Sequence, residues 1–186
     1  DTAASAIAKK LKSRRLLLMT NVEGVYDDRK TLISEIKPFD IENLIKLNAL
    51  SRPQYAYCAY YSAILAKKLN YKKISFLEFG VAKGNGLLCL EELASRIEKE
   101  IDIEIEIYGF DTGKGLIEPK DYRDLPYFFQ GGMYKMDINE LKKRLKRSKL
   151  ILGDVNQTAK SFIDNYKPGK IAAIFNDLDF YSSTIN

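Results

Sequence analysis

The sequence predicts an α/β fold built on a parallel β-sheet. From residue 72 onward, short apolar runs alternate with amphipathic segments that have a helical pattern. The apolar runs have the length of strands, and they span residues 72–80, 103–111, 149–155 and 170–180. Strands that alternate with helices are typical of a parallel sheet with right-handed crossover connections. We therefore expect about four core strands, with a helix–strand appendage at the N-terminus.

The segments between these strands carry helix and loop signals. Helical patterns cover residues 85–100, 137–148 and 158–166, and Asp137 is a typical N-terminal cap. A loop rich in Gly, Pro and Asp spans residues 112–132. The alternation of strand and helix therefore continues to the last predicted strand, with one long interruption.

Before residue 72, the chain lacks this regular alternation of strands and helices. Residues 1–13 predict a helix, residues 14–20 a buried strand and residues 21–38 polar turns. Two amphipathic helices follow at residues 40–50 and 54–70. On the second of these, three apolar side chains share one face and are expected in the core or in a pocket wall: Tyr57, Tyr61 and Ile64.

The composition is that of an ordinary globular protein, with 46% hydrophobic residues and a net charge of +5. No apolar run approaches the roughly 20 residues that cross a bilayer. Cys58 and Cys89 lack the spacing of metal ligands. The densest basic cluster, residues 142–149, favours a solvated helix face over a nucleic-acid site. We expect a cytoplasmic protein without membrane or nucleic-acid partners.

Histidine is absent from the chain. Its absence excludes serine–histidine triads, histidine general bases and histidine metal ligands. Any chemistry must therefore use carboxylates, Lys, Tyr, Cys or backbone groups.

The stretch "FLEFGVAKGNG", residues 76–86, ends the first predicted core strand with three glycines. Gly80, Gly84 and Gly86 are spaced i, i+4, i+6, which departs from the G-x-G-x-x-G pattern of NAD sites. The stretch also lacks the G-K-[ST] ending of a phosphate-binding loop. Missing side chains at Gly84 and Gly86 would let a ligand approach the backbone, and Glu78 could accept from an ammonium or hydroxyl group. The alternative is a plain tight turn between strand and helix.

Acids stand at the ends of the next three strands. Asp111 follows the second strand, Asp154 the third, and Asp177 and Asp179 the fourth. Ligands of open parallel sheets bind beyond the carboxyl ends of the strands. Asp111 suits a bidentate contact to two ribose hydroxyls, Asp154 an adenine amino group, and the D-x-D pair a hard cation such as Mg²⁺. The alternatives are a surface acid, a turn residue after Gly153, and an acid pair bound to backbone and solvent.

The four strand ends, "EFGVAKGNG", "YGFDTGKGL", "LILGDV" and "NDLDFYSST", resemble class I S-adenosylmethionine-dependent methyltransferases, most closely the macrocin O-methyltransferase type. The resemblance covers residues 40–186. It implies a Rossmann-like, doubly wound sheet, here incomplete because the family's sheet has more strands than the four predicted.

The resemblance also assigns roles to residues. The first strand end would bind the methionine part of S-adenosylmethionine through Glu78, Phe79, Gly80, Ala82, Gly84 and Gly86. Asp111 would bind the ribose and Asp154 would lie by the adenine. Asp177 and Asp179 would bind Mg²⁺. Some relatives use a histidine base, which Asp177, a Lys or a metal-bound hydroxide would replace here, and Asp177 is the expected catalytic residue. The acceptor would be a hydroxyl of a sugar or polyol-like small molecule, and residues 112–136 would shape its binding side.

Residues 1–38 show a different resemblance. The stretches "DTAASAIAKKLK" and "LLLMTNVEGVYD" resemble part of acetylglutamate kinase and related amino-acid kinases, with Asn21 where that family usually has Asp. The resemblance implies a kinase-like fragment at residues 1–38 joined to the front part of a methyltransferase domain at residues 39–186, with truncation at both ends. The junction is expected between Leu32 and Ile41.

Methyl transfer is thus the leading functional hypothesis, and three alternatives remain. One is an amino-acid kinase fragment, another a truncated, non-catalytic cofactor-binding module. The third, an NAD-dependent enzyme, conflicts with the glycine spacing.

Overall fold

A computed structural model describes residues 40–185, which belong to the unit Phe39–Asn186. The helix and strand expected within residues 1–38 lie outside the described residues. Within the described part, no helix is both long enough and apolar enough to cross a membrane.

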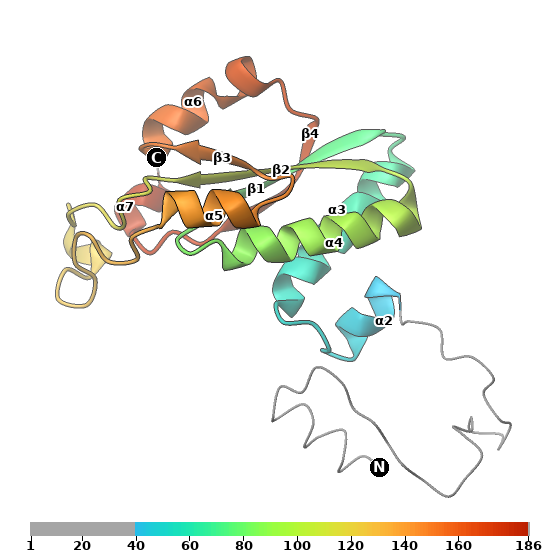
Figure 1. Cartoon of the computed structure of the whole chain (residues 1–186), viewed down its shortest axis with the longest axis horizontal. Coiled ribbons are helices and arrows are strands. Elements are labelled where there is room, and N and C mark those ends of the chain that lie inside the picture. The colour runs from blue at the N-terminus through green and yellow to red at the C-terminus, as the bar shows by residue number, and fades with distance from the viewer. Residues whose placement is uncertain (1–39, 186) are drawn as a thin grey trace, which may run out of the picture. The chain divides into compact units, whose positions relative to one another are not determined.

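Four parallel strands form one sheet in the order β3-β2-β1-β4 (Figure 1). Their bounds are Lys73–Phe79 for β1, Glu104–Asp111 for β2, Lys149–Leu152 for β3 and Lys170–Asn176 for β4. The chain adds β2 and β3 on one side of β1 and then places β4 on the other side, and this reversal between β1 and β4 is the arrangement of a doubly wound sheet. The predicted α/β class and the four strands are therefore confirmed.

Within residues 40–185, seven helical segments precede, connect or follow these strands. The structure gives them these bounds: α2 Ile41–Lys46, α3 Pro53–Lys68, α4 Asn85–Ile101, η1 Tyr122–Asp124, α5 Ile138–Arg144, α6 Val155–Tyr166 and α7 Tyr181–Thr184. Helix α6 begins three residues before the prediction because the Asp154 carboxylate accepts from Asn156 N and caps the helix there. Helix α7 and the single turn η1 were not predicted, since neither is long enough to show a period.

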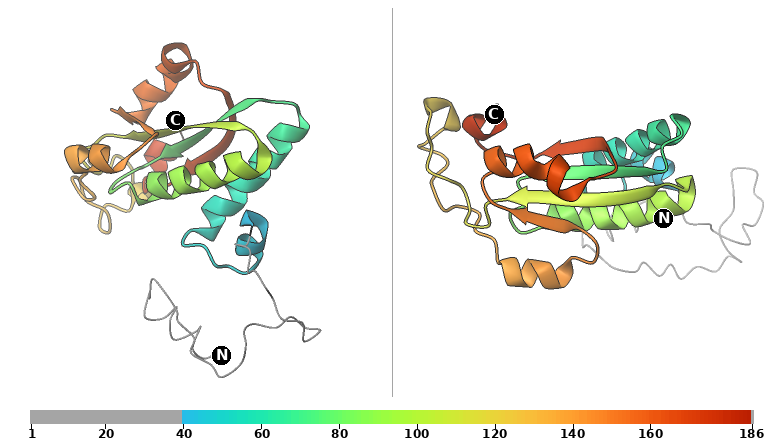
Figure 2. Two further views of the ribbon diagram at one scale, coloured as in Figure 1. Left: turned by 45° about the vertical axis from the view of Figure 1, so that its right-hand side comes forward. Right: turned by 90° about the horizontal axis from the view of Figure 1, so that it is seen from above.

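The two faces of the sheet bury different side chains because strand side chains alternate. Along β2, Ile105 and Ile107 belong to the core with α3 and α4, whereas Tyr108 and Phe110 pack with Phe162 of α6. Helices α3 and α4 thus lie on one side of the sheet and α6 on the other, as Figures 1 and 2 show. Strand β1 is buried on both faces and is accordingly mostly apolar, whereas β4 leaves Ile171 and Ile174 exposed.

Helix α3 buries a different face from the one predicted. Tyr57 is 59% exposed, and Tyr61 and Ile64 are only partly buried. The buried stripe is instead Tyr55, Ala56, Ala59, Tyr60, Ala63 and Ala66. Four alanines in this stripe allow α3 to pack closely on its neighbours. The prediction followed the large aromatic residues and missed the small ones.

The basic cluster is largely solvated. Lys142, Lys143 and Arg144 are exposed on α5, as expected. Arg147 differs from these residues because it makes structural hydrogen bonds. Its guanidinium donates to both carboxylate oxygens of Glu98 at 2.6 Å and to Ile105 O at 2.6 Å. This part of the cluster therefore ties the start of β3 to α4 and β2.

Candidate functional site

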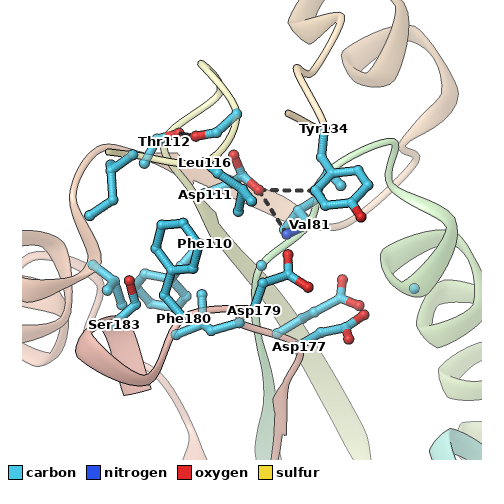
Figure 3. Close-up of a pocket in the computed structure, with 18 of the residues that line it drawn as sticks. Val81, Phe110, Asp111, Thr112, Leu116, Tyr134, Asp177, Asp179, Phe180 and Ser183 are labelled. Carbon is cyan, nitrogen blue, oxygen red and sulfur yellow. Dashed lines mark hydrogen bonds between the residues drawn. The ribbon is translucent and has the colours of Figure 1, made fainter. Parts of the chain in front are cut away.

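A cavity of about 400 Å³ opens at the carboxyl ends of the strands (Figure 3). Its lining includes eight of the predicted site residues: Glu78, Gly80, Ala82, Gly86, Asp111, Asp154, Asp177 and Asp179. Phe79 and Gly84 do not line it. The Phe79 ring packs on Phe110 with centroids 4.6 Å apart, and its carbonyl accepts from Asp177 N at 2.8 Å. One cavity therefore collects residues from the ends of all four strands.

The glycine turn between β1 and α4 needs its glycines for protein contacts. Gly80 has φ +87° and Gly84 has φ +81°, which L side chains rarely adopt. A Cβ at Gly80 would overlap the Asp177 carbonyl oxygen, one at Gly84 the Leu141 side chain, and one at Gly86 the Glu78 carboxylate. A ligand was expected beside the backbone of Gly84 and Gly86, but protein atoms occupy that space. The close approach of Gly80 to β4 is what brings Asp177 beside the turn.

A substitution at Gly86 tests this packing. Gly86 has no positive φ, so alanine there meets only the Glu78 carboxylate. We expect Gly86→Ala to destabilise the fold by about 1–3 kcal/mol, because the buried carboxylate must move. Denaturant unfolding measures the change. Equal stability of Gly86→Ala and wild type would contradict the close contact, and Gly132→Ala, whose nearest neighbour is the flexible end of Lys135, is the comparison for a strained but open glycine.

Asp111 holds the glycine turn in place. Its Oδ2 accepts from Val81 N and Ala82 N, both at 2.9 Å, and its Oδ1 accepts from Gly113 N at 2.6 Å. Ala82 has φ +47°, an unfavourable conformation for a residue with a side chain. The two hydrogen bonds to Asp111 compensate for that conformation. Asp111 is thus a structural carboxylate of the turn as well as a residue of the cavity wall.

Glu78 places a nearly buried carboxylate in the cavity. Its side chain is 1% exposed, and its Oε1 accepts from the Tyr55 hydroxyl at 2.8 Å. Among residues 40–185, its Oε2 finds no hydrogen-bond partner. Burial raises the pKa of Glu78 to about 7, against the opposing effects of the Tyr55 hydrogen bond and the Arg52 charge. The cavity thus holds a buried carboxyl group whose pKa is near neutral pH. One of its two oxygens has no hydrogen-bond partner among the described residues.

The acids after β4 and β3 lie at the same rim. Asp177 and Asp179 are side by side in Figure 3. Burial and the charge of Asp177 both raise the pKa of Asp179. Asp154 is exposed at the N-terminus of α6, where it caps the helix. Between residues 40 and 185, no three or more His, Cys, Asp or Glu residues gather as a metal-binding group.

Several residues of the cavity wall were not singled out from the sequence, although residues 112–136 as a segment were expected to shape the binding side. Arg52 enters from the start of α3, and its guanidinium stacks on Tyr55 at 4.9 Å from the ring centroid. The loop after β2 and the segment after β4 supply the others: Leu116, Ile117, Tyr134, Phe180 and Ser183. Loop residues lack the hydrophobic periodicity by which helices and strands are recognised in a sequence. The only available signal was that the loop directly follows the acid at the end of β2.

Sequence relatives and solved structures match different parts of the chain. Residues 1–54 match the amino acid kinase family. Acetylglutamate kinase of Desulforamulus reducens is 51% identical over 49 residues, which is 25% of this chain and 17% of that enzyme. Acetylglutamate kinase of Brachyspira hyodysenteriae is 48% identical over 54 residues, 27% of this chain and 19% of that enzyme. The matched segment is therefore a small part of these kinases.

Among solved structures, CalS11, a calicheamicin methyltransferase, superposes with a TM-score of 0.52 over 77% of this chain and 66% of its own. The chain and CalS11 share a fold. Sequence identity is 20%, so the likeness concerns the fold alone. The chain spans just under two thirds of this structure's length. The resemblance that the strand ends predicted is therefore confirmed for the architecture of the sheet and its helices.

Proposed function

We propose that the chain is an S-adenosylmethionine-dependent O-methyltransferase domain that acts on a hydroxyl of a sugar or polyol-like small molecule. One observation carries the proposal. A single cavity joins the glycine turn to acids from the ends of β2, β3 and β4. Doubly wound sheets bind their ligands at this edge. The likeness to the fold of a methyltransferase supports the same assignment.

The chemistry of the cavity fits S-adenosylmethionine. The unpartnered Oε2 of Glu78 suits the cofactor's ammonium group. The N-terminus of α4, where Asn85 and Gly86 line the cavity, suits its carboxylate. Any contact of Asp111 to the ribose uses lone pairs left over from its three backbone hydrogen bonds. Asp154 lies on the adenine side in this proposal.

Mg²⁺ is the second proposed ligand. Asp177 and Asp179 place two carboxylates close enough for the charge of one to raise the pKa of the other. Mg²⁺ is commonly held by one or two carboxylates and several waters, so this donor set fits a hydrated ion. Asp177 and Asp179 would hold the ion, which would lower the pKa of an acceptor hydroxyl.

The residues of the chain then act by positioning and by proton transfer. When bound, the cofactor supplies an electrophilic methyl group on a sulfonium. The cavity walls would hold an acceptor hydroxyl in position for attack on that methyl group, with the thioether as leaving group. Asp177 accepts the hydroxyl proton, which leaves neutral thioether and methyl ether as products. Leu116, Ile117 and Phe180 exclude water from the reacting atoms.

Neutralising the acid pair tests these roles. We expect Asp177→Asn and Asp179→Asn each to lower methyl transfer by about 100-fold or more, in the range typical of acid–base catalysis. The affinity for S-adenosylmethionine should stay within about threefold, because these acids are assigned to the acceptor side. The assay follows methyl transfer to a panel of glycosides with and without Mg²⁺. Asp164→Asn on the exposed face of α6 is the control. Unchanged turnover of both variants would remove the acids from the mechanism.

A second candidate function concerns the N-terminal segment alone. The match of residues 1–54 to the amino acid kinase family favours a kinase-derived piece there. We propose that this piece ends near residue 38, because Ile41 of α2 is fully buried in the same core as α3 and α4. Nucleotide binding that disappears on deletion of residues 1–38 would support a kinase role. ATP binding that is equal with and without the segment would contradict it.

A further inference from the structure

The loop after β2 is fastened to the segment after β4 by one buried carboxylate. Asp124 of η1 is fully buried. Its Oδ2 accepts from Lys120 N at 2.9 Å and Asp121 N at 3.1 Å within the loop. It also accepts from Ser182 Oγ at 2.8 Å, and its Oδ1 accepts from Ser182 N at 2.8 Å. We call these four hydrogen bonds the Asp124 latch.

A second contact runs parallel to the latch. Arg123 is held by both carboxylate oxygens of Asp121, at 2.8 and 2.7 Å. Its guanidinium then lies over the Tyr181 ring, 3.8 Å from the centroid. The loop and α7 lie together at the carboxyl end of the sheet in the right-hand view of Figure 2. Two neighbouring residues of η1 thus contact two neighbouring residues of α7.

The latched segment carries part of the cavity wall. Ser182 lies between Phe180 and Ser183, which both line the cavity, and three residues after Asp179. Helix α7 is four residues long and its N-cap, Phe180, makes no side-chain capping bond. A helix this short has little stability of its own. Its position therefore depends on the burial of Phe180, on the contact of Tyr181 with Arg123 and on the hydrogen bonds of Ser182 to Asp124.

We propose that Asp124 is a positioning residue that, through Ser182, holds the Phe180–Ser183 wall beside Asp179 in the geometry for acceptor binding. The inference rests on the proposed methyl transfer for its acceptor, but the latch itself is a property of the fold. The loop supplies the opposite wall through Leu116, Ile117 and Tyr134. One carboxylate therefore sets the distance between the two sides of the acceptor region.

The variant Asp124→Asn tests the latch in the full chain. Asparagine keeps the shape but has one acceptor oxygen, so its amide nitrogen must face backbone donors. We expect the amides of Ser183 and Thr184, which bond to Phe180 O at 3.2 Å, to exchange hydrogen at least tenfold faster. The Asp177 amide, bonded to Phe79 O, should be unchanged. Ser182→Ala, which removes only the hydroxyl contact, should give a smaller change in the same direction.

The functional readout separates positioning from loss of stability. For the best glycoside acceptor, we expect Asp124→Asn to raise KM at least tenfold while KM for S-adenosylmethionine changes less than twofold. Asp137→Ala, which removes the N-cap of α5 at a residue outside the cavity lining, is the matched control for destabilisation. Wild-type amide exchange, or an acceptor KM changed no more than in Asp137→Ala, would overturn the proposal. If wild type methylates no glycoside, the proposed function fails, and amide exchange alone decides the latch.

Discussion

Replacing Asp111 by alanine is expected to abolish measurable binding of S-adenosylmethionine and to destabilise the fold. The carboxylate accepts three backbone N–H groups, two of them from Val81 and Ala82 in the glycine turn. Hydrogen bonds to charged groups contribute roughly 1.5–3 kcal/mol each. Asp111 is only partly buried, so water can take over part of the released N–H groups and the total loss is smaller than the sum of three bonds. We expect a loss of about 2–4 kcal/mol in unfolding free energy and a fall of at least about 100-fold in affinity.

Asp111→Asn refines this experiment. Asparagine has one acceptor oxygen and cannot replace both carboxylate oxygens. The variant should therefore lose part of the stability and most of the affinity. Asp164→Ala, which changes an exposed acid of α6 outside the cavity lining, is the control. Isothermal titration and denaturant unfolding measure the two effects. Wild-type stability of Asp111→Ala would contradict the structural role of this carboxylate.

Replacing Glu78 by glutamine is expected to stabilise the free chain at pH 8 and to weaken cofactor binding. Burial raises the pKa of Glu78 from 4.5 to about 7. Between these values the folded chain keeps a proton that the unfolded chain has lost. The stability of wild type is therefore full below about pH 4.5 and falls as the pH rises to about 7. A shift of this size corresponds to roughly 3 kcal/mol.

Glutamine removes this pH dependence because it does not ionise. Its side-chain oxygen can still accept from the Tyr55 hydroxyl, so the neutral contact is preserved. We expect Glu78→Gln to match wild type near pH 4 and to exceed it by about 1–3 kcal/mol at pH 8. Affinity for S-adenosylmethionine at pH 8 should fall at least about tenfold, since the ammonium loses its charged partner. Parallel pH–stability curves for the two proteins would contradict the buried, ionising acid.

The strands and most site residues could be predicted because the carboxyl edge of a parallel sheet follows directly from the chain. Once residues 73–79, 104–111, 149–152 and 170–176 are strands, the acids that follow them must lie at one rim. The strand ends and the cavity agree for this reason. The roles of individual residues follow less directly. A side chain at Gly84 would overlap Leu141, which is distant in sequence. A side chain at Gly86 would overlap Glu78 of the preceding strand.

Contacts between distant loops could not be predicted. Arg52 reaches the cavity from before α3, and Asp124 binds Ser182 across 58 residues of chain. Neither contact has a period or a local motif. The same limit applies to α3, where small residues rather than the conspicuous Tyr57 face the core. Patterns along the chain identify elements and their ends, whereas three-dimensional packing decides which side chains meet.

Titration of the full chain with S-adenosylmethionine tests the central claim most directly. The cavity at the strand ends predicts saturable binding with one site per chain. The Asp111→Ala variant should lose that binding and Asp164→Ala should retain it. ATP and NAD in place of the cofactor should give no comparable heat. No saturable heat from S-adenosylmethionine, or equal binding by wild type and Asp111→Ala, would contradict the assignment of this cavity.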